Sequence, residues 1–323
     1  MKKVLGIAGL LLAVVIATTL LSRGDDGAFT FLGRGNLENL LQRIGMFGIL
    51  SIAAAFVIVT GGIDLSIGSM VCVAGCLLPW CVRDAGWSPW LALPLVLLLT
   101  AGLGLLHGVL VVGVGLQPFV VTLCGLLLYR GLMRAFTQDQ TMGFGENDTL
   151  AWLGDGKLQL GGFGVPVQAL ILLAVAIVAA VLLNKTVWGR HLMALGRNEE
   201  AARFAGVPTG RLTVLAYAMC GLLSGVGGCL FVLWSNSASA ASFGNFYELY
   251  AIAGAVLGGT ALRGGEASVL GVVLGASLMQ VLGNAINLVA DGNQLEFAIV
   301  GAVILAGAAF DEGVRRLLRR RSR

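Results

Sequence analysis

Long apolar runs separated by short polar segments set the pattern of this chain. Most of the runs approach the ~20 residues that a helix needs to cross a bilayer. The runs that we expect to cross a membrane are 4–21, 44–60, 67–82, 90–112, 117–135, 167–183, 212–234, 251–262, 269–289 and 295–310. The pattern predicts an all-α polytopic membrane protein with about ten transmembrane helices, folded as a single domain over residues 1–323.

Two features near the N-terminus refine this pattern. Lys2 and Lys3 precede the first run, as they would in a signal peptide. The run is long and lacks a clear small-x-small cleavage site, so we expect a retained first span. Residues 36–43 read NLENLLQR, an amphipathic pattern that predicts a short helix before the second span, with Asn36 as its N-cap.

Composition and charge placement agree with a membrane protein. The chain is 57% hydrophobic and only 12% charged, whereas soluble domains carry about 25% charged residues. Its net charge of +4 is small, and the basic residues gather in segment 188–211 and in the tail 313–323. Basic segments stay on the cytoplasmic side, so both termini are expected inside and the acidic loop 137–166 outside. Nothing in this distribution suggests nucleic-acid binding.

The six cysteines and two histidines do not form an obvious reactive site. Cys72 and Cys76 share a helix face, which would suit a metal pair, but no charged partner lies nearby, so small apolar packing residues are favoured. No disulfide framework and no metal site are expected. An intramembrane enzyme needs a converging nucleophile and base or a metal set, whereas His107 and His191 lie far apart in depth.

Segment 188–211, WGRHLMALGRNEEAARFAGVPTGR, cannot sit in lipid although apolar runs flank it. Asn198 is a good N-cap, and Glu199 and Glu200 would face the positive end of the following helix. Gly206 can take the left-handed conformation that ends a helix, and Pro208 stops it continuing. The pattern predicts a short capped helix suited to a groove of another protein; the alternative is an ordinary basic loop on the cytoplasmic side.

The same segment carries a family resemblance. GR-x4-ALG-x-N-x2-AAR-x-AGV resembles the cytoplasmic coupling segment of ribose-type permeases, the membrane subunits of ATP-driven (ABC) importers for monosaccharides. The resemblance implies a type II ABC importer-like fold and a coupling helix that docks on an ATPase subunit. The coupling residues that it implies are Gly189, Arg190, Gly196, Asn198, Glu199, Ala201, Ala202, Ala205 and Gly206.

A second motif, GGIDLSIGS at residues 61–69, resembles the same family. Asp64 is a carboxylate between apolar runs, which is costly at membrane depth unless it has a partner or water. The flanking glycines would break the helix where the backbone is buried or lines a cavity; the alternative is a solvated turn at the membrane edge. Gly258-Gly259 echoes Gly61-Gly62, which hints at an internal repeat.

Further segments extend the resemblance over nearly the whole chain. QPFVVTL at 117–123 is similar to the family's turn into its fifth span, and YEL at 247–249 is similar to a later motif. Two residues depart from the family pattern. Tyr250 replaces the acidic residue usual after YEL, and His107 lies where the family usually has Asn, a change that bears on substrate choice.

Few polar residues are available at membrane depth for a sugar path or gate. The candidates are Asp64, Ser66, Ser69, His107, Gln280, Asn284 and Asn287. The last three are spaced by four and three residues, so they share one helix face. That face should meet a cavity or a helix partner, and hydrogen bonding for helix assembly is the alternative. Packing is the alternative for His107. We expect a structural or gating role for Asp64, because a tight carboxylate–sugar bond would slow release.

The sequence therefore predicts the permease subunit of an ATP-driven monosaccharide importer in the bacterial inner membrane, working by alternating access. The chain has no GxxxxGK[ST] phosphate loop, so we expect no enzyme activity and no cofactor of its own, with ATP and Mg²⁺ bound by a partner ATPase. Further expected partners are a periplasmic sugar-binding protein, a second permease copy or paralogue, and membrane lipid. The sequence leaves open which sugar is carried. An alternative is an ion-coupled secondary carrier with a relay through Asp64, His107 and Glu248, although such a carrier has no use for a coupling helix.

Overall fold

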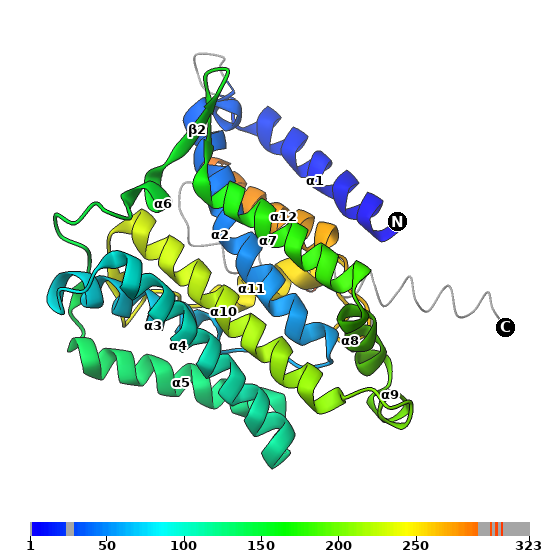
Figure 1. Cartoon of the computed structure of the whole chain (residues 1–323). Coiled ribbons are helices and arrows are strands. Elements are labelled where there is room, and N and C mark those ends of the chain that lie inside the picture. The colour runs from blue at the N-terminus through cyan, green and yellow to red at the C-terminus, as the bar shows by residue number, and fades with distance from the viewer. Residues whose placement is uncertain (1, 24–28, 290–297, 299–300, 303–304, 306–323) are drawn as a thin grey trace.

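The computed structural model of the chain describes residues 2–23, 29–289, 298, 301–302 and 305. Its described elements are helices, short helical turns and two small antiparallel sheets (Figure 1). The helices are α1 Lys2–Leu21, α2 Arg34–Val59, α3 Ile67–Pro79, α4 Pro89–Val109, α5 Pro118–Thr137, α6 Ala151–Asp155, α7 Val167–Lys185, α8 Val187–Arg197, α9 Glu199–Phe204, α10 Thr209–Ser235, α11 Tyr247–Leu257 and α12 Val269–Val289. A 3-10 turn, η1 Thr30–Leu32, precedes α2, and π-helical turns extend α3 (η2 Trp80–Asp84) and α4 (η3 Leu110–Val114).

Eight helices of the described part are long and apolar enough to cross a membrane, and they confirm the all-α polytopic fold. They are α1, α2, α3 with η2, α4 with η3, α5, α7, α10 and α12. The expected span 251–262 is a shortened helix: α11 has 11 residues, or about 16 Å of the ~30 Å hydrocarbon core. The non-helical segments on either side of α11 complete the passage from β4 at one end of the bundle to Gly265 at the other. The expected span 295–310 lies largely outside the described residues, and the tail 313–323 lies wholly outside them.

The short amphipathic helix expected at 36–43 is not a separate element. Helix α2 runs without a break for 26 residues from Arg34, and its N-cap position is Gly33 rather than Asn36. No glycine or proline separates residue 43 from the second apolar run, so the helix continues through both. The Asn36 amide instead donates to the Phe31 carbonyl at 2.9 Å, outside the helix.

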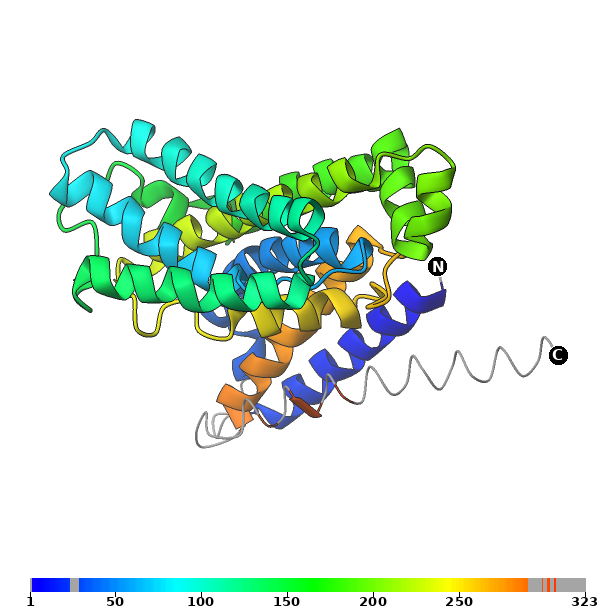
Figure 2. The same cartoon turned by 90° about the horizontal axis from the view of Figure 1, so that it is seen from below.

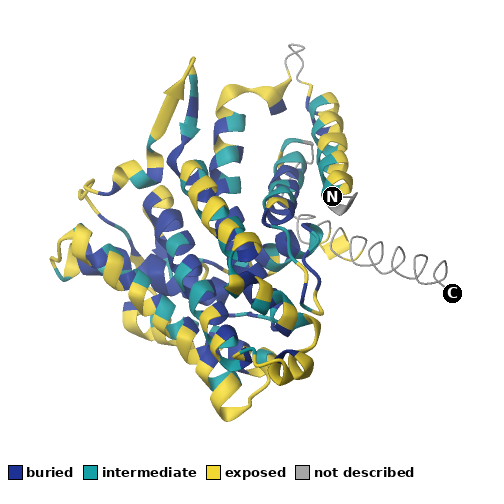
Figure 3. Ribbon diagram, turned by 45° about the vertical axis from the view of Figure 1, so that its right-hand side comes forward, coloured by how far each residue is buried: buried dark blue, intermediate teal, exposed yellow. Residues whose placement is uncertain are grey.

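Helix α2 forms the centre of the bundle. In its most apolar stretch 89% of the residues are buried, against 6% for α1, and Figure 3 shows this contrast as dark blue and yellow ribbon. Helices α4 and α5 lie on one side of α2, and α12 and α1 lie on the other (Figure 2). The core joins α2 to α10 and α11, where the Phe47 ring meets Phe231 edge to face at 5.1 Å and Tyr247 at 4.9 Å. Lipid would meet the exposed apolar faces of the outer helices.

Small residues allow α10 to approach α4 closely. A Cβ at Gly104 would fall on the Tyr217 carbonyl, and one at Gly221 would fall on the Thr100 carbonyl. Backbones at this separation gain dense van der Waals packing, which is the main attraction between helices in lipid. This contact fixes α4, and therefore His107, against α10.

Two small sheets tie together segments at one end of the bundle. Strands β2 Lys157–Leu160 and β3 Phe163–Pro166 form a hairpin, and β1 Thr141–Met142 pairs with β4 Ala238–Ser239. The hairpin projects beyond the N-terminal end of α2, whereas α8 and α9 lie at the other end of that helix (Figure 1). The two ends of the bundle therefore carry different elements, the β2–β3 hairpin at one and α8 with α9 at the other.

The two Gly-Gly turns have the same backbone geometry. Gly61 after α2 and Gly259 after α11 both have φ of +87°, a left-handed conformation that costs glycine little. Each donates its N–H three residues back, to Ile58 and to Val256. This match is consistent with the repeat suggested by the sequence.

Candidate functional site

The α8–α9 segment has the capping that its sequence predicts. The Asn198 side chain accepts a hydrogen bond from the Ala201 N–H at 2.9 Å and so caps α9. Glu199 and Glu200 occupy the first turn, where they face the positive helix end. Gly206 takes φ of +79° just after the helix, which confirms it as the terminator.

The outward face of α9 differs from the expected one at a single residue. Ala202 is 6% exposed and faces the protein, so it does not belong with Ala201 and Ala205, which are exposed. The six-residue helix lies on the bundle with one side, and Ala202 falls on that side. The largest outward side chain is Phe204, which is 81% exposed. The exposed apolar side chains of this segment are therefore Ala201, Phe204 and Ala205.

Four glycines join the α8–α9 segment to the turn after α2; we call Gly61, Gly196, Gly264 and Gly265 the glycine junction. The Gly265 N–H donates to the Val59 carbonyl at 2.9 Å. A Cβ at Gly196 would lie well under 3.0 Å from both of those atoms, and one at Gly264 would lie 2.8 Å from the Gly61 nitrogen. The backbone at the end of α8 thus touches the turn that leads to Asp64.

The structure brings Asp64, Ser66, Ser69 and His107 together in one buried polar cluster. Asp64 Oδ1 accepts from the Ser66 N–H at 2.8 Å and from the Ser66 hydroxyl at 2.6 Å. Ser66 Oγ lies 3.4 Å from His107 Nδ1, and the Ser69 hydroxyl donates to the Ser66 carbonyl at 2.8 Å. Asp64 is 1% exposed, so the alternative of a solvated turn at the membrane edge is wrong.

Sequence reasoning missed three residues of this cluster. Tyr129 on α5 places its hydroxyl 2.7 Å from His107 Nε2, and the two rings stack at 5.4 Å. Tyr217 and Cys220 on α10 are fully buried and interact electrostatically with Asp64. The available signal was a tyrosine inside an apolar span, because a buried tyrosine hydroxyl usually finds a hydrogen-bond partner.

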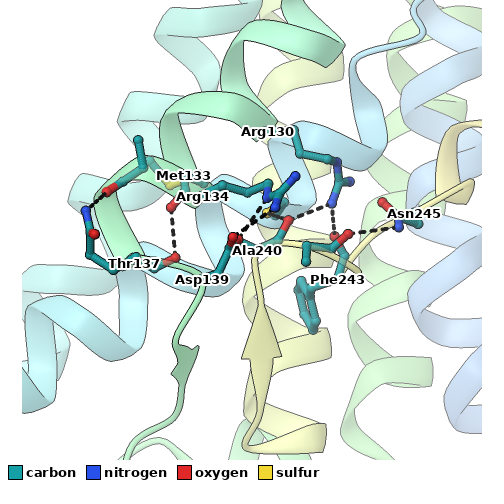
Figure 4. A network of polar contacts seen from close by, with 12 residues as sticks. Arg130, Met133, Arg134, Thr137, Asp139, Ala240, Phe243 and Asn245 are labelled. Atoms are coloured by element: carbon teal, nitrogen blue, oxygen red, sulfur yellow. Dashed lines mark hydrogen bonds and ion pairs between the residues drawn. The ribbon is translucent and has the colours of Figure 1, made fainter.

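Arg130 on α5 is a further residue that the sequence analysis passed over. Its guanidinium donates to the carbonyls of Ala240 at 3.1 Å and Phe243 at 3.0 Å, in the non-helical segment between α10 and α11 (Figure 4). A charge inside an apolar run was the signal that it had a specific partner. Glu248, which is buried at the start of α11, interacts electrostatically with this arginine. Arg130 thereby satisfies backbone carbonyls that no helix pairs.

The end of α5 is fixed by an ion pair between Arg134 in its last turns and Asp139 just after the membrane span. Arg134 donates to both carboxylate oxygens of Asp139 at 2.8 Å (Figure 4). These hydrogen bonds to the Arg134 guanidinium lower the pKa of Asp139 below its ordinary value. The Thr137 hydroxyl also bonds the Met133 carbonyl at 2.9 Å and closes the last turn.

The three candidate polar residues of α12 lie apart from the Asp64 cluster. Gln280 is buried, Asn287 is exposed, and Asn284 exchanges two side-chain hydrogen bonds with Asn36 at 2.7 and 3.1 Å. Helix α12 packs on α1, α2 and α11, whereas the cluster lies among α3, α4, α5 and α10. The reciprocal amide pair supports the helix-assembly alternative for Asn284.

Within the described residues, no group of three or more His, Cys, Asp or Glu side chains is arranged to hold a metal ion. Cys72 and Cys76 are buried, and Cys124 is the one exposed cysteine of this part of the chain.

Comparison with known proteins identifies the family to which this chain belongs. A protein-family model described as branched-chain amino acid transport system / permease component matches residues 36–308. The chain is 33% identical to the ribose import permease protein RbsC of Escherichia coli K12 over 304 residues, 93% of this chain and 92% of the relative. It is 33% identical to RbsC of Bacillus subtilis over 312 residues, 96% and 93% of the two chains, and 30% identical to the fructose import permease protein FruF of Bifidobacterium longum over 276 residues, 84% and 76%.

No solved structure matches the chain. The family match covers most of the sequence, and these relatives align over most of both chains. This multi-pass membrane protein therefore belongs to the family of ABC-importer permeases described as branched-chain amino acid transport system permease components.

Proposed function

We propose that this protein is the permease subunit of an ATP-driven importer that carries a monosaccharide into the bacterial cell. The observation that carries the proposal is its similarity over nearly the full chain to permeases named for ribose and fructose. A periplasmic sugar-binding protein delivers the substrate, and the permease releases it to the cytoplasm by alternating access. A second copy of this chain or a paralogue completes the transporter.

The α8–α9 segment is the proposed docking element for the ATPase. It is capped at Asn198, and its outward face presents Phe204 between two alanines, so a large apolar side chain is available for a groove. Truncating a docking side chain should weaken binding of the ATPase, since buried aromatic anchors dominate the binding energy of many interfaces. ATP and Mg²⁺ are bound by the ATPase and not by this chain. Glu199 and Arg190 are exposed beside the face, where they can contribute polar contacts at its rim.

The orientation follows from charge. The basic α8–α9 segment stays inside because moving Lys and Arg across the membrane is costly. The β2–β3 end of the bundle, with the acidic loop 137–166, then faces outside, and both termini lie in the cytoplasm. This orientation places Phe204 on the ATPase side and the exposed Trp152 on the receptor side.

The sugar path is proposed to pass the Asp64 cluster. The glycine junction connects the α8–α9 segment to the turn that carries Asp64, so closure of the ATPase can reach that turn through backbone contact. Asp64, Ser66, Ser69 and His107 form the gate in this proposal. Gln280, Asn284 and Asn287 of α12 lie apart from this gate, and we assign Asn284 to helix packing through its amide pair with Asn36.

The decisive experiment is reconstitution of the permease with its ATPase in vesicles, with the receptor outside, followed by uptake of a panel of labelled monosaccharides. Uptake of one sugar should require both ATP inside and receptor outside. Uptake driven by a proton or sodium gradient without ATP would instead establish the ion-coupled carrier and overturn the proposal.

A matched pair of variants tests docking separately from transport. Phe204→Asp should abolish co-purification of the ATPase while the permease still inserts, because a carboxylate cannot enter an apolar groove without a large desolvation cost. Trp152→Asp, at a 66% exposed aromatic on the other end, should leave co-purification unchanged. Equal ATPase recovery with both variants would show that α9 does not dock.

A further inference from the structure

The non-helical segment 240–246, between α10 and α11, lies at membrane depth. The backbones of Gly244 and Gly68 pack so closely that a Cβ on either glycine would overlap the carbonyl oxygen of the other. Gly68 is the second residue of the 13-residue α3, so this contact lies about 16 Å from the end of that helix. The Phe243 ring covers Gly75, further along the same helix. The segment therefore runs along α3, which with η2 is long and apolar enough to cross a membrane.

Arg130 holds this segment from outside. Its guanidinium donates to the Ala240 carbonyl at 3.1 Å and to the Phe243 carbonyl at 3.0 Å (Figure 4). The same guanidinium donates to the Gly68 carbonyl at 3.5 Å, and the Cys72 thiol is a weak second donor to Ala240 at 3.7 Å. One side chain of α5 thus joins the segment to the first turn of α3.

The other side of the segment is open and polar. Ala240 and Gly244 are buried against the bundle, whereas Ser242 and Asn245 are exposed. Arg130 is half-buried next to them. Irregular backbone and polar side chains at membrane depth are tolerated where they meet protein or a water-filled cavity, and not where they meet lipid. The open side of the segment therefore differs from the apolar faces of the outer helices, because lipid cannot cover it.

We propose that segment 240–246 lines a water-filled substrate path, in which Ser242 and Asn245 exchange hydrogen bonds with sugar hydroxyls. A hydroxyl and an amide both donate and accept, as sugar hydroxyls do, and neither carries a charge that would retain the sugar. Arg130 is the positioning residue: it holds the segment in place and does not itself contact the sugar. This assignment rests on the proposed transport function.

The position of the segment beside the gate supports the assignment. Its contact at Gly68 falls between Ser66 and Ser69 of the Asp64 cluster, so the path continues directly from the segment to the gate. The Glu248 carboxylate also lies against Gly68 and interacts electrostatically with Arg130. The arginine charge is therefore offset within the protein, which suits a path for an uncharged ligand.

Labelling with a charged, membrane-impermeant thiol reagent tests water access in the full transporter reconstituted in lipid nanodiscs. Cysteines are placed at Ser242 or Asn245 after the exposed Cys124 is changed to alanine, and both should react. Leu173 is the matched control site, because it is 58% exposed on α7 and lies about 9 Å from the start of that helix. Leu173→Cys should not react, since lipid covers it.

The nucleotide state distinguishes a path from the outer solution. Because alternating access opens and closes a path, the labelling rate of Ser242→Cys should change about tenfold between the nucleotide-free transporter and the transporter trapped with ATP and vanadate. Asp148→Cys, in the exposed acidic loop, should react equally in both states. The assignment is overturned if Ser242→Cys is as unreactive as Leu173→Cys, or if its rate, like that of Asp148→Cys, does not depend on the nucleotide.

Variants of Arg130 test its positioning role. Arg130→Met leaves two carbonyls without their charged donor and should shift the labelling rate of Ser242→Cys about tenfold. Arg130→Lys should restore the rate, because an ammonium group can still donate to both carbonyls. Equal rates with both variants would refute the positioning role, and if Arg130→Met fails to insert, the two labelling comparisons above still decide the path.

The path and the transport function can fail separately. Sugar uptake by a transporter whose Ser242→Cys is unreactive would overturn the path along segment 240–246 and leave the transport function standing. Nucleotide-dependent labelling in a transporter that imports no sugar would support the water-filled path and refute only the transport function.

Discussion

Gly196→Ala is the sharpest perturbation of the link between the α8–α9 segment and the turn after α2. The added Cβ would lie well under 3.0 Å from the Val59 carbonyl and the Gly265 nitrogen, and 3.1 Å from the Gly264 carbonyl carbon. All three neighbours are backbone atoms, so no flexible side chain can turn away. The clash also separates the donor and acceptor of the 2.9 Å bond between Gly265 and Val59.

The magnitude follows from these two losses. Overpacking a fitted contact costs about 1–3 kcal/mol, and losing one backbone hydrogen bond costs about 0.5–1.5 kcal/mol. A combined cost of about 1.5–4.5 kcal/mol lowers the population of the joined arrangement by roughly 10- to 2,000-fold relative to a detached one. The α8–α9 segment would still fold, because its own caps are untouched, but its motion would no longer reach the Asp64 turn.

The assay compares ATP hydrolysis with sugar uptake in the reconstituted transporter. Gly196→Ala should insert, bind the ATPase and hydrolyse ATP, while uptake per ATP falls at least tenfold. Gly102→Ala is the matched control, because a Cβ at Gly102 meets no atom within 4 Å. Wild-type thermal stability and wild-type uptake per ATP in the Gly196 variant would refute the reasoning about the glycine junction.

Three further results are expected. Asn284→Leu should lower the thermal stability of the permease, and adding Asn36→Leu should recover part of the loss, with a coupling energy of about 0.6 kcal/mol in a double-mutant cycle; additive losses would show that the pair is not coupled. Asp139→Asn removes the ion pair with Arg134. Because the folded-state pKa of Asp139 is lowered, this pair stabilises the protein above the ordinary aspartate pKa, and the stabilisation is lost as the pH falls through the lowered pKa. The thermal stabilities of variant and wild type should therefore differ at neutral pH and converge in acid. In intact cells, an impermeant reagent should label a cysteine placed at Asp148 and should not label one placed at Arg197. The reverse pattern would show that the orientation is inverted.

The sequence predicts those elements that are determined by residues close together in the chain. Span positions follow from apolar runs, and the α9 caps at Asn198 and Gly206 follow from residue type and spacing, so both are recovered. The burial of Ala202 was not predictable, because it depends on how a six-residue helix packs against α8 and α10. The continuity of α2 could have been inferred, since no helix-breaking residue lies between 36–43 and the following run.

The Asp64 cluster also has a part that could be predicted from the sequence and a part that could not. Asp64, Ser66 and Ser69 are close in sequence, and a short motif predicts that they act together. Tyr129 and His107 meet only because α4 and α5 pack at one depth, and nothing in the spacing of 22 residues fixes that depth. Grouping the α12 asparagines with the path was reasonable from their shared face, but a pattern within one helix does not identify the neighbour. Asn36 became that neighbour through tertiary packing.

The central position of α2 has a consequence for synthesis. Gln42 donates to the Gly154 carbonyl, 112 residues later in the chain, and Glu38 accepts from Lys157 and from the Gly164 N–H, 119 and 126 residues later. These partners have not been made when α2 leaves the ribosome. At ~5–20 residues per second, Glu38 waits about 6–25 seconds for the last of them. During that interval Glu38 keeps its ion pair with Arg34 at 2.7 Å, but its other carboxylate oxygen and the Gln42 amide must remain near water or a chaperone, so α2 settles fully into the bilayer only after the β2–β3 hairpin follows it.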